Sequence, residues 1–424
     1  MNVARVLSPA SARRLTIMRQ HLAGPRPSPD SEGIMNMMQD IRYLQYDPLR
    51  VVAPSHLLVL WSRLGQYDPA LLDALLWKER KIFEDWAQTT SIVLTEDYSI
   101  FNALKQGFAS DNTPSARQIR GWMEKNKNFG DYILDQLKRR GPLLLSQFED
   151  RAVESWQSTG WSARRNININ MMLLFLKAQG KIMIAGRVGN QRLWDLTEHF
   201  LPKWVSQERL LEHEVARRAA QLSLRALGVA TAKHIRQHFV RRCYYELDKV
   251  LAELESEERI FKVAIREGEK SWSDSWYIHS EDMPLLDSLE DDEWKPRTTL
   301  LSPFDNLISD RQRAEQLFSF SFRFEVYVPK PQRKYGCYVM PILHGDRFIG
   351  RIDPVMDRKT GRLMINAVYA EPHAPSSDRV ARDVAKTIKE LGAFLGAKEI
   401  CYSSKTPVTW KKHLAGKQFL KERK

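Results

Sequence analysis

The chain has 424 residues, of which 43% are apolar and 10% aromatic, a composition typical of folded globular proteins and unlike that of disordered ones. Lys and Arg total 65 against 52 Asp and Glu, and the resulting net charge of +13 favours an acidic partner, either nucleic acid or an anionic membrane surface. No apolar run is long enough to cross a bilayer, and the N-terminus lacks a signal-peptide pattern, so we expect a cytoplasmic protein.

The cysteines and histidines argue against metal and disulfide chemistry. Cys243, Cys337 and Cys401 lie far apart without a Cys-x-x-Cys pair, and the ten histidines form no ligand pair such as His-Glu-x-x-His. No glycine-rich phosphate loop precedes a helical segment either. The sequence therefore predicts no disulfide framework, no metal site and no cofactor.

The region 1–125 is mostly helical, and a short polar motif interrupts its pattern. Gln45, Tyr46 and Asp47 precede Pro48, which disfavours the helical conformation for Asp47. In an extended backbone, residues two apart project to the same side, so Gln45 and Asp47 would face one space. A carboxylate and a carboxamide can together hold and deprotonate a water there. The alternative is that Asp47 starts a turn and Gln45 is a solvated side chain.

The rest of this first region alternates helical and extended patterns. Helices are expected over 56–64 and 68–77, and a strand over 81–86. A further helix is expected where Ser115 and Gln118 have the capping-box spacing. We interpret the region as a first, irregular winged helix.

The region 126–204 predicts a regular winged helix. Three helical segments and then two hairpin strands are expected, over 131–140, 144–148, 162–179, 181–185 and 191–196. In such a module the third helix can enter a DNA groove and the wing can touch phosphates. Four arginines occupy suitable positions, namely Arg164, Arg165, Arg187 and Arg192. The alternative is a structural or protein-binding module whose arginines are solvated.

The same order recurs in the region 205–292. A long helix, a short helix capped by Thr231, a third helix and two strands are expected, over 206–227, 231–239, 244–255, 259–265 and 275–278. Tandem modules of one kind would present a curved basic surface that can follow a duplex. A run of acidic residues between 281 and 293 indicates a domain boundary.

Beyond residue 293 the pattern becomes β-rich. Apolar and polar residues alternate from Phe318 to Val328, which predicts a strand with one buried face. Four more strands and a helix starting at Ser377 or Asp378 are expected, the strands over 337–343, 347–353, 362–370 and 399–403. The sequence thus predicts an α+β protein of three tandem winged-helix (helix-turn-helix) domains and a C-terminal β-barrel-like domain, with boundaries at 1–125, 126–204, 205–292 and 293–424.

Three stretches resemble one family. They are Leu44-Gln45-Tyr46-Asp47 with Ser62-Arg63-Leu64-Gly65 behind it, Leu301-Ser302-Pro303-Phe304-Asp305-Asn306-Leu307, and the segment from Asp310-Arg311 to Tyr335-Gly336. The chain resembles the YcaQ and AlkZ kind of winged-helix DNA glycosylases, bacterial enzymes associated with alkylated bases and interstrand crosslinks. The family's catalytic pattern is Gln, a hydrophobic residue, then Gln or Asp, and this chain matches the second form. Where many relatives have Trp-Ala-His-Glu, it has Trp86-Ala87-Gln88-Thr89.

The resemblance implies a monofunctional DNA glycosylase of base excision repair. It would act as a monomer on duplex DNA, hydrolyse the N-glycosidic bond of cationic alkylated purines, and unhook interstrand crosslinks. Asp47 would activate a water and stabilise the oxocarbenium-like sugar, and Gln45 would orient that water. Tyr46, Trp86 and Gln88 would support the pocket. The expected DNA contacts are Arg50, Arg63, Arg164, Arg165, Arg187, Arg192, Arg311, Arg313, Lys330, Arg333 and Lys334, of which the last three lie in a strand-turn-strand expected over 328–335.

Two other functions fit parts of the sequence. In a non-enzymatic transcriptional regulator, the winged helices would bind an operator and the C-terminal domain a ligand or partner. In a metal-dependent nuclease, Asp346, Asp353 and Asp357 would hold the ion, although these residues also suit turns.

Overall fold

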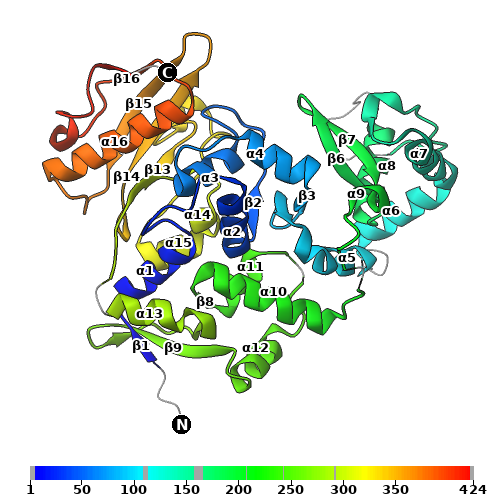
Figure 1. Cartoon of the computed structure of the whole chain (residues 1–424), viewed down its shortest axis with the longest axis horizontal. Helices are drawn as coiled ribbons and strands as arrows, with labels where there is room; N and C mark the ends of the chain where they lie inside the picture. Colours follow the sequence, from blue (N-terminus) through cyan, green and yellow to red (C-terminus); the bar gives the residue numbers. More distant parts are fainter. Residues whose placement is uncertain are drawn as a thin grey trace. The chain divides into compact units, whose positions relative to one another are not determined.

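The computed structural model describes residues 5–107, 113–156, 166–206, 208–241, 243–290 and 293–420, and the chain forms two compact units (Figure 1). The larger unit comprises Met1–Leu72, Trp86–Ile92 and Ala216–Lys424, and the smaller unit Asp73–Asp85 and Val93–Val215. Both contain helices and strands, as the α+β prediction required. Among the described residues, no helix has the length and apolar character needed to cross a membrane.

The N-terminal part of the larger unit places the Gln45–Asp47 motif between two helices. Its elements are β1 (Arg5–Leu7), α1 (Pro9–Arg19), α2 (Ser31–Ile41), β2 (Tyr43–Gln45) and α3 (Ser55–Leu64). Helix α2 buries Ile34, Met38 and Ile41 on one face, the spacing typical of an amphipathic helix. Helix α3 ends at Gly65, whose φ of 79° suits a residue without a side chain. Strand β2 confirms the extended backbone at Gln45.

The chain crosses between the two units inside strands β3 (Ile82–Trp86) and β4 (Thr90–Leu94), and the expected strand over 81–86 is confirmed. The helix expected over 68–77 is α4 (Ala70–Asp73) followed by a π-helical turn, η1 (Ala74–Lys78). The order of the small sheet is β2-β4-β3. The backbone N–H of Tyr46 also donates to the Thr90 carbonyl, so the residue after β2 stays beside β4.

In the smaller unit, helical segments are followed by a hairpin, but the expected helix over 144–148 is only a short 3-10 turn, and the winged-helix assignment stays a prediction. It contains η2 (Thr95–Asp97), α5 (Tyr98–Gly107), α6 (Pro114–Lys125), α7 (Lys127–Arg140), β5 (Leu143–Leu144), η3 (Leu145–Gln147), α8 (Ile167–Ala178), β6 (Ile182–Val188), β7 (Gln191–Leu196) and α9 (Thr197–Phe200). The hairpin β6–β7 is confirmed and pairs with β5 in the order β5-β7-β6. The expected capping box was wrong, because Thr113 and not Ser115 caps α6.

A second helical block with a hairpin belongs to the larger unit except for the start of its first helix. Its elements are α10 (Glu212–Leu227), β8 (Val229–Thr231), α11 (Ala232–His238), α12 (Leu247–Ser256), β9 (Ile260–Glu267), β10 (Lys270–Ser271), β11 (Trp276–His279), η4 (Ser280–Asp282) and α13 (Met283–Glu290). Thr231 caps α11 as expected. The N-terminal strand β1 joins this sheet parallel to β9, which gives the order β1-β9-β11-β8. The number of winged helices and the four-domain division stay predictions.

The C-terminal part of the larger unit is a six-stranded sheet that curls into a half barrel. Its elements are β12 (Thr298–Leu300), α14 (Asn306–Ser309), α15 (Arg311–Phe318), η5 (Lys330–Gln332), β13 (Met340–His344), β14 (Arg347–Asp357), β15 (Arg362–Ala370), α16 (Asp378–Phe394), β16 (Glu399–Tyr402), η6 (Val408–Trp410) and β17 (Lys417–Phe419). The strand order is β12-β13-β14-β15-β16-β17. Helix α16 is capped by Ser377, so it starts where the sequence predicted, and it buries Val380, Val384 and Ile388.

The strand expected from Phe318 to Val328 is wrong. Phe318 ends α15, and the residues after it belong to no strand. The alternation is nevertheless real, because Phe318, Phe320 and Phe322 are buried while Ser319 and Ser321 are exposed. A period of two shows that a chain is extended with one buried face, but it does not show that a neighbouring strand is available for pairing.

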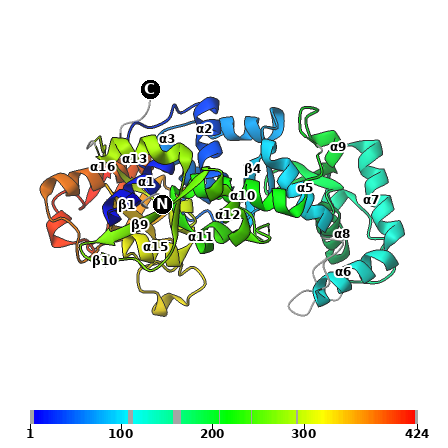
Figure 2. The same cartoon turned by 90° about the horizontal axis from the view of Figure 1, so that it is seen from below.

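The strand-turn-strand expected over 328–335 is also wrong. Only the short η5 turn is regular there, and the next strand, β13, starts at Met340. The loop is held internally, because the Glu325 carboxylate accepts from the N–H groups of Lys334, Tyr335 and Gly336. The segment between α15 and β13 projects from the body of its unit in Figure 2.

Candidate active site

The backbone of the Gln45–Asp47 motif is fixed by one hydroxyl. Ser55, the first residue of α3, is fully buried, and its Oγ donates to the Gln45 carbonyl at 2.6 Å. The same Oγ accepts from the N–H of Asp47 at 3.1 Å. Ser55 therefore joins both ends of the motif to the start of a helix, and the spacing of the two polar residues is set by a rigid element.

Only one of the polar side-chain atoms of Gln45 and Asp47 accepts a hydrogen bond within the described residues. One carboxylate oxygen of Asp47, Oδ1, accepts from the Leu49 N–H at 2.9 Å, which closes the turn before Val51. Among the described residues, neither the other oxygen of Asp47 nor the carboxamide of Gln45 has a hydrogen-bonding partner. Both side chains are half-buried. The local structure thus combines the two alternatives drawn from the sequence, because Asp47 does start a turn and still keeps one oxygen for another ligand.

The aromatic residue of the motif faces α3. The ring of Tyr46 stacks on His56 with centroids 4.8 Å apart and an interplanar angle of 13°. Next to it runs the turn between β3 and β4, closed by the bond from the Ala87 N–H to the Thr89 carbonyl. Trp86 at the start of this turn is 63% exposed, which is unusual for an indole in a folded protein.

Gln88 anchors the same turn. Its Nε2 donates to the Gln237 carbonyl and its Oε1 accepts from Nε of Arg241 at 2.9 Å. Both ends of the carboxamide are therefore used to hold the turn against the end of α11. Glutamine is neutral, so the anchor that it provides carries no charge that changes with pH.

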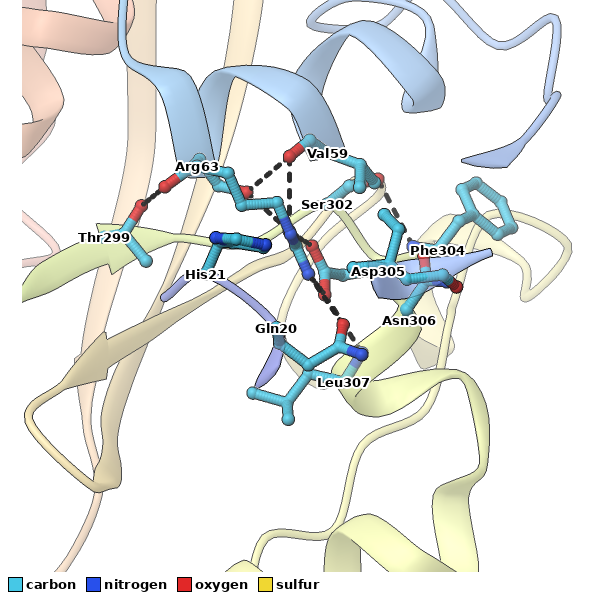
Figure 3. Close-up of polar contacts among 12 residues, drawn as sticks. Gln20, His21, Val59, Arg63, Thr299, Ser302, Phe304, Asp305, Asn306 and Leu307 are labelled. Atoms are coloured by element: carbon cyan, nitrogen blue, oxygen red, sulfur yellow. Dashed lines mark hydrogen bonds and ion pairs between the residues drawn. The ribbon is translucent and has the colours of Figure 1, made fainter. Parts of the chain in front are cut away.

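The stretch 301–307 contacts the residues that lead into the motif. Asn306 is buried, and its Nδ2 donates to the carbonyls of Ile41 and Tyr43 at the start of β2. Asp305 forms a fully buried two-bond ion pair with Arg63 of α3, at 2.6 and 2.9 Å. Figure 3 shows the Arg63 guanidinium between Asp305 and Gln20, whose Oε1 accepts at 3.0 Å. This network ties α3 and β2 to the C-terminal region.

The half-barrel sheet holds the loop that follows the motif. Arg358, just beyond β14, donates to the carbonyls of Arg50 and Val52. The Met356 N–H donates to the Val51 carbonyl at 3.0 Å. Tyr338, just before β13, is fully buried; burial, and less strongly the nearby charge of Asp47, raise the pKa of its hydroxyl. The C-terminal sheet therefore reaches the site directly.

Two of the expected DNA contacts, Arg63 and Arg313, are buried, and a third, Arg311, is half-buried. Arg63 has no exposed side-chain surface and is bound to Asp305. Arg313 is 2% exposed and donates to the carbonyls of Leu227 and Val229, and burial lowers its pKa to about 10. Arg311 donates to the Pro303 carbonyl and lies over the Phe322 ring at 4.5 Å. Their guanidinium groups hold segments of the protein together, so they are not placed to bind phosphates.

The other expected DNA contacts differ in exposure and in the partners of their side chains. Arg50, Lys330 and Lys334 are exposed, whereas Arg333 donates to two carbonyls of its own loop, those of Val326 and Val328. In the smaller unit, Arg187 makes a two-bond ion pair with Glu84, with both distances 2.7 Å. Arg192 is half-buried over Trp194. Arg164 and Arg165 lie outside the described residues.

The three aspartates considered for a metal-dependent nuclease do not form a common site. Asp346 pairs with Arg13, and Asp357 accepts from the Thr360 hydroxyl. Asp353 accepts from the Cys337 N–H and from Asn366. Within the part of the chain that the structure describes, no three His, Cys, Asp or Glu side chains come together as a metal site.

Comparison with known proteins identifies the family of the chain. The model of the family described as DNA glycosylase AlkZ-like matches residues 38–394. The chain belongs to this DNA glycosylase family. Among solved structures, the DNA glycosylase AlkZ of Streptomyces sahachiroi is similar, with a TM-score of 0.63 at 14% identity over 94% of this chain and 99% of that one. At such low identity the likeness concerns the fold. Membership of the family makes DNA the substrate of this AlkZ-like chain and a glycosylase activity its chemistry.

Sequence reasoning missed the residues that position the motif in this AlkZ-like chain. Ser55 directly follows Pro54 at a helix start, a position typical of a capping serine, but its partners lie 8 and 10 residues upstream. Asn306 stands in a stretch that carried the resemblance, yet its contacts are to residues more than 260 positions away. Arg358 gave no local signal at all.

Proposed function

We propose that this chain is a monofunctional DNA glycosylase that acts as a monomer and hydrolyses the N-glycosidic bond of cationic alkylated purines, of the N7-alkylguanine type. The observation that supports this most directly is the Asp47 carboxylate. Its Oδ1 is held by the Leu49 N–H, its backbone is held by Ser55, and its second oxygen is left for a water. A carboxylate restrained in this way can act at one defined position on the substrate.

The chemistry needs only one such carboxylate. Alkylation at N7 of guanine makes the base cationic, so the bond to C1′ is weakened and the base leaves without protonation. Asp47 takes a proton from the water that attacks C1′ and stabilises the positive charge that develops on the sugar. Gln45 orients the water through its carboxamide, which can donate and accept.

The exposed indole of Trp86 provides a place for the cationic base. Strand β3, which ends at Trp86, is the second neighbour of β2, so their backbones are about 10 Å apart at the usual strand spacing. An indole face attracts a cation by roughly 0.5–2 kcal/mol. Gln88 and Tyr46 support this surface, Gln88 by fixing the turn and Tyr46 by packing on His56. Because Trp86 is exposed and not enclosed, a base that is tied to both strands could reach it, as unhooking an interstrand crosslink requires.

Exposed cations would hold the duplex around this site. Arg50 follows the motif directly, and Lys330 and Lys334 lie on the projecting loop before β13. Arg333 keeps that loop in shape through its own carbonyl contacts. In the smaller unit, Arg187 is already neutralised by Glu84.

The test is the variant Asp47→Asn. Asparagine preserves the acceptor for the Leu49 N–H but cannot take the proton, so excision should fall by about 10²- to 10⁴-fold while DNA binding changes little. Excision is followed on a duplex with one N7-methylguanine by alkaline cleavage of the abasic product, and a crosslinked duplex is run in parallel. Undiminished excision by Asp47→Asn would show that this carboxylate is not the base.

A matched control comes from the C-terminal sheet. Asp357 makes the same kind of turn, with Oδ1 accepting from the Lys359 N–H two residues on, but its second oxygen is already bonded to the Thr360 hydroxyl. Asp357→Asn should therefore excise at the wild-type rate. If the wild-type chain binds DNA but leaves no alkali-sensitive site on either substrate, the transcriptional regulator becomes the better description.

A further inference from the structure

A basic groove lies on the larger unit, formed by α16 and the segment after η6. Its volume is about 450 Å³. The lining includes Arg382, Lys386 and Lys389 of α16, together with Lys412 and His413. No expected DNA contact lies in this groove, which belongs to the outer side of the helix whose other side covers the half-barrel sheet.

The groove is strongly positive because little neutralises it. Asp378 is its acidic neighbour, and that carboxylate is shared by Arg382, Lys412 and His413, at 3.4, 3.9 and 2.7 Å. Lys386 and Lys389 are exposed and have no acidic partner among the described residues.

The carboxylates nearest along α16 are oriented to other elements. Glu390 pairs with Arg26 at 2.9 Å, and the charge of Asp383 acts on His344. Arg379, Lys411 and Lys417 are exposed nearby and add to the excess of positive charge.

We propose that this groove binds the phosphate backbone of a nucleic acid strand, as a second contact surface in addition to the candidate active site. The inference rests on the proposed action on DNA, but it does not depend on the role of Asp47. The cations of α16 are three and four residues apart, so they lie roughly 4.5 and 6 Å apart along the helix axis. Phosphates of one DNA strand follow each other every 3.4 Å or so of duplex axis, so the row can contact two or three of them.

The experiment compares two double variants that lose the same charge. Lys386→Ala/Lys389→Ala removes the two groove lysines that have no acidic partner, and alanine preserves the helix. Lys295→Ala/Lys398→Ala removes two exposed lysines of the same unit that do not line the groove. Affinity for an undamaged duplex is measured from 50 to 200 mM salt.

Two lost phosphate contacts should lower the slope of log affinity against log salt by about 1.8, so the ratio of wild-type to variant affinity should change by about tenfold over this range. The control variant should keep the wild-type slope, and the groove variant should excise N7-methylguanine at the wild-type rate once saturated. An unchanged slope, or an equal loss in the control, would overturn the proposal.

Two further outcomes are distinguishable. If the wild-type chain excises nothing while the slope still depends on Lys386 and Lys389, the glycosylase proposal fails and the groove stands. If binding to vesicles containing phosphatidylserine depends on these lysines while the DNA slope does not, the groove serves a membrane surface and our inference is wrong.

Discussion

Replacing Ser55 by alanine tests how the fold positions the candidate base. The change removes one oxygen that accepts from the Asp47 N–H and donates to the Gln45 carbonyl, at 3.1 and 2.6 Å. Leaving such groups without a partner costs about 1–3 kcal/mol each when they are fully buried. Because both groups are only partly buried, water can replace part of the loss, and we expect the free energy of unfolding to fall by about 1–3 kcal/mol in total.

The effect on excision should be larger than this loss of stability suggests. Once the clamp is gone, the backbone of Asp47 can move, and a misplacement of roughly 1 Å can lower a rate by about 10²-fold. Single-turnover excision with excess enzyme on an N7-methylguanine duplex measures this effect, and urea unfolding measures the stability. Binding of undamaged DNA should stay near the wild-type value.

Ser223→Ala is the matched control. Ser223 is also buried, and its hydroxyl bonds the Tyr244 hydroxyl at 2.7 Å within the α10–α12 block. It should lose about 1 kcal/mol of stability without loss of excision. Excision at the wild-type rate by Ser55→Ala, or an equal loss of activity in Ser223→Ala, would show that Ser55 does not position Asp47.

Two further predictions concern stability. Arg63→Met should lower the free energy of unfolding by about 3–5 kcal/mol in urea, because it leaves the Asp305 carboxylate buried without a partner; if Arg63 bound DNA instead, the loss would appear in affinity and not in folding. Burial lowers the pKa of His238 to about 3, below its value of about 6.5 in an unfolded chain, so its contribution is complete above pH 6.5 and is lost as the pH falls towards 3. His238→Phe, which preserves a ring beside Tyr43, should therefore reduce the acid dependence of stability by about 1.4 kcal/mol per pH unit between pH 6 and 4, whereas an unchanged slope would mean that His238 is protonated in the folded chain.

Local rules accounted for those features that depend on neighbours in the sequence. The spacing of apolar residues predicted α16 and the β6–β7 hairpin, and the extended backbone expected at the motif is present at Gln45, the last residue of β2. In each case the physical cause acts over a few residues: one face of a helix, a turn, or the steric effect of proline on the residue before it.

The motif itself was recognisable in the sequence, but its supports were decided by the tertiary structure. The alternation of apolar and polar residues after Phe318 predicted correctly which side chains are buried, but not strand pairing. A strand also needs the free edge of a neighbouring strand to pair with. Arg63 and Arg313 carry the positive charge expected of DNA contacts. Both are nevertheless buried and bonded to residues far away in the sequence. Whether a cation meets a carboxylate or carbonyl from another part of the chain, or meets solvent, depends on which segments pack together, and no local pattern in the sequence contains that information.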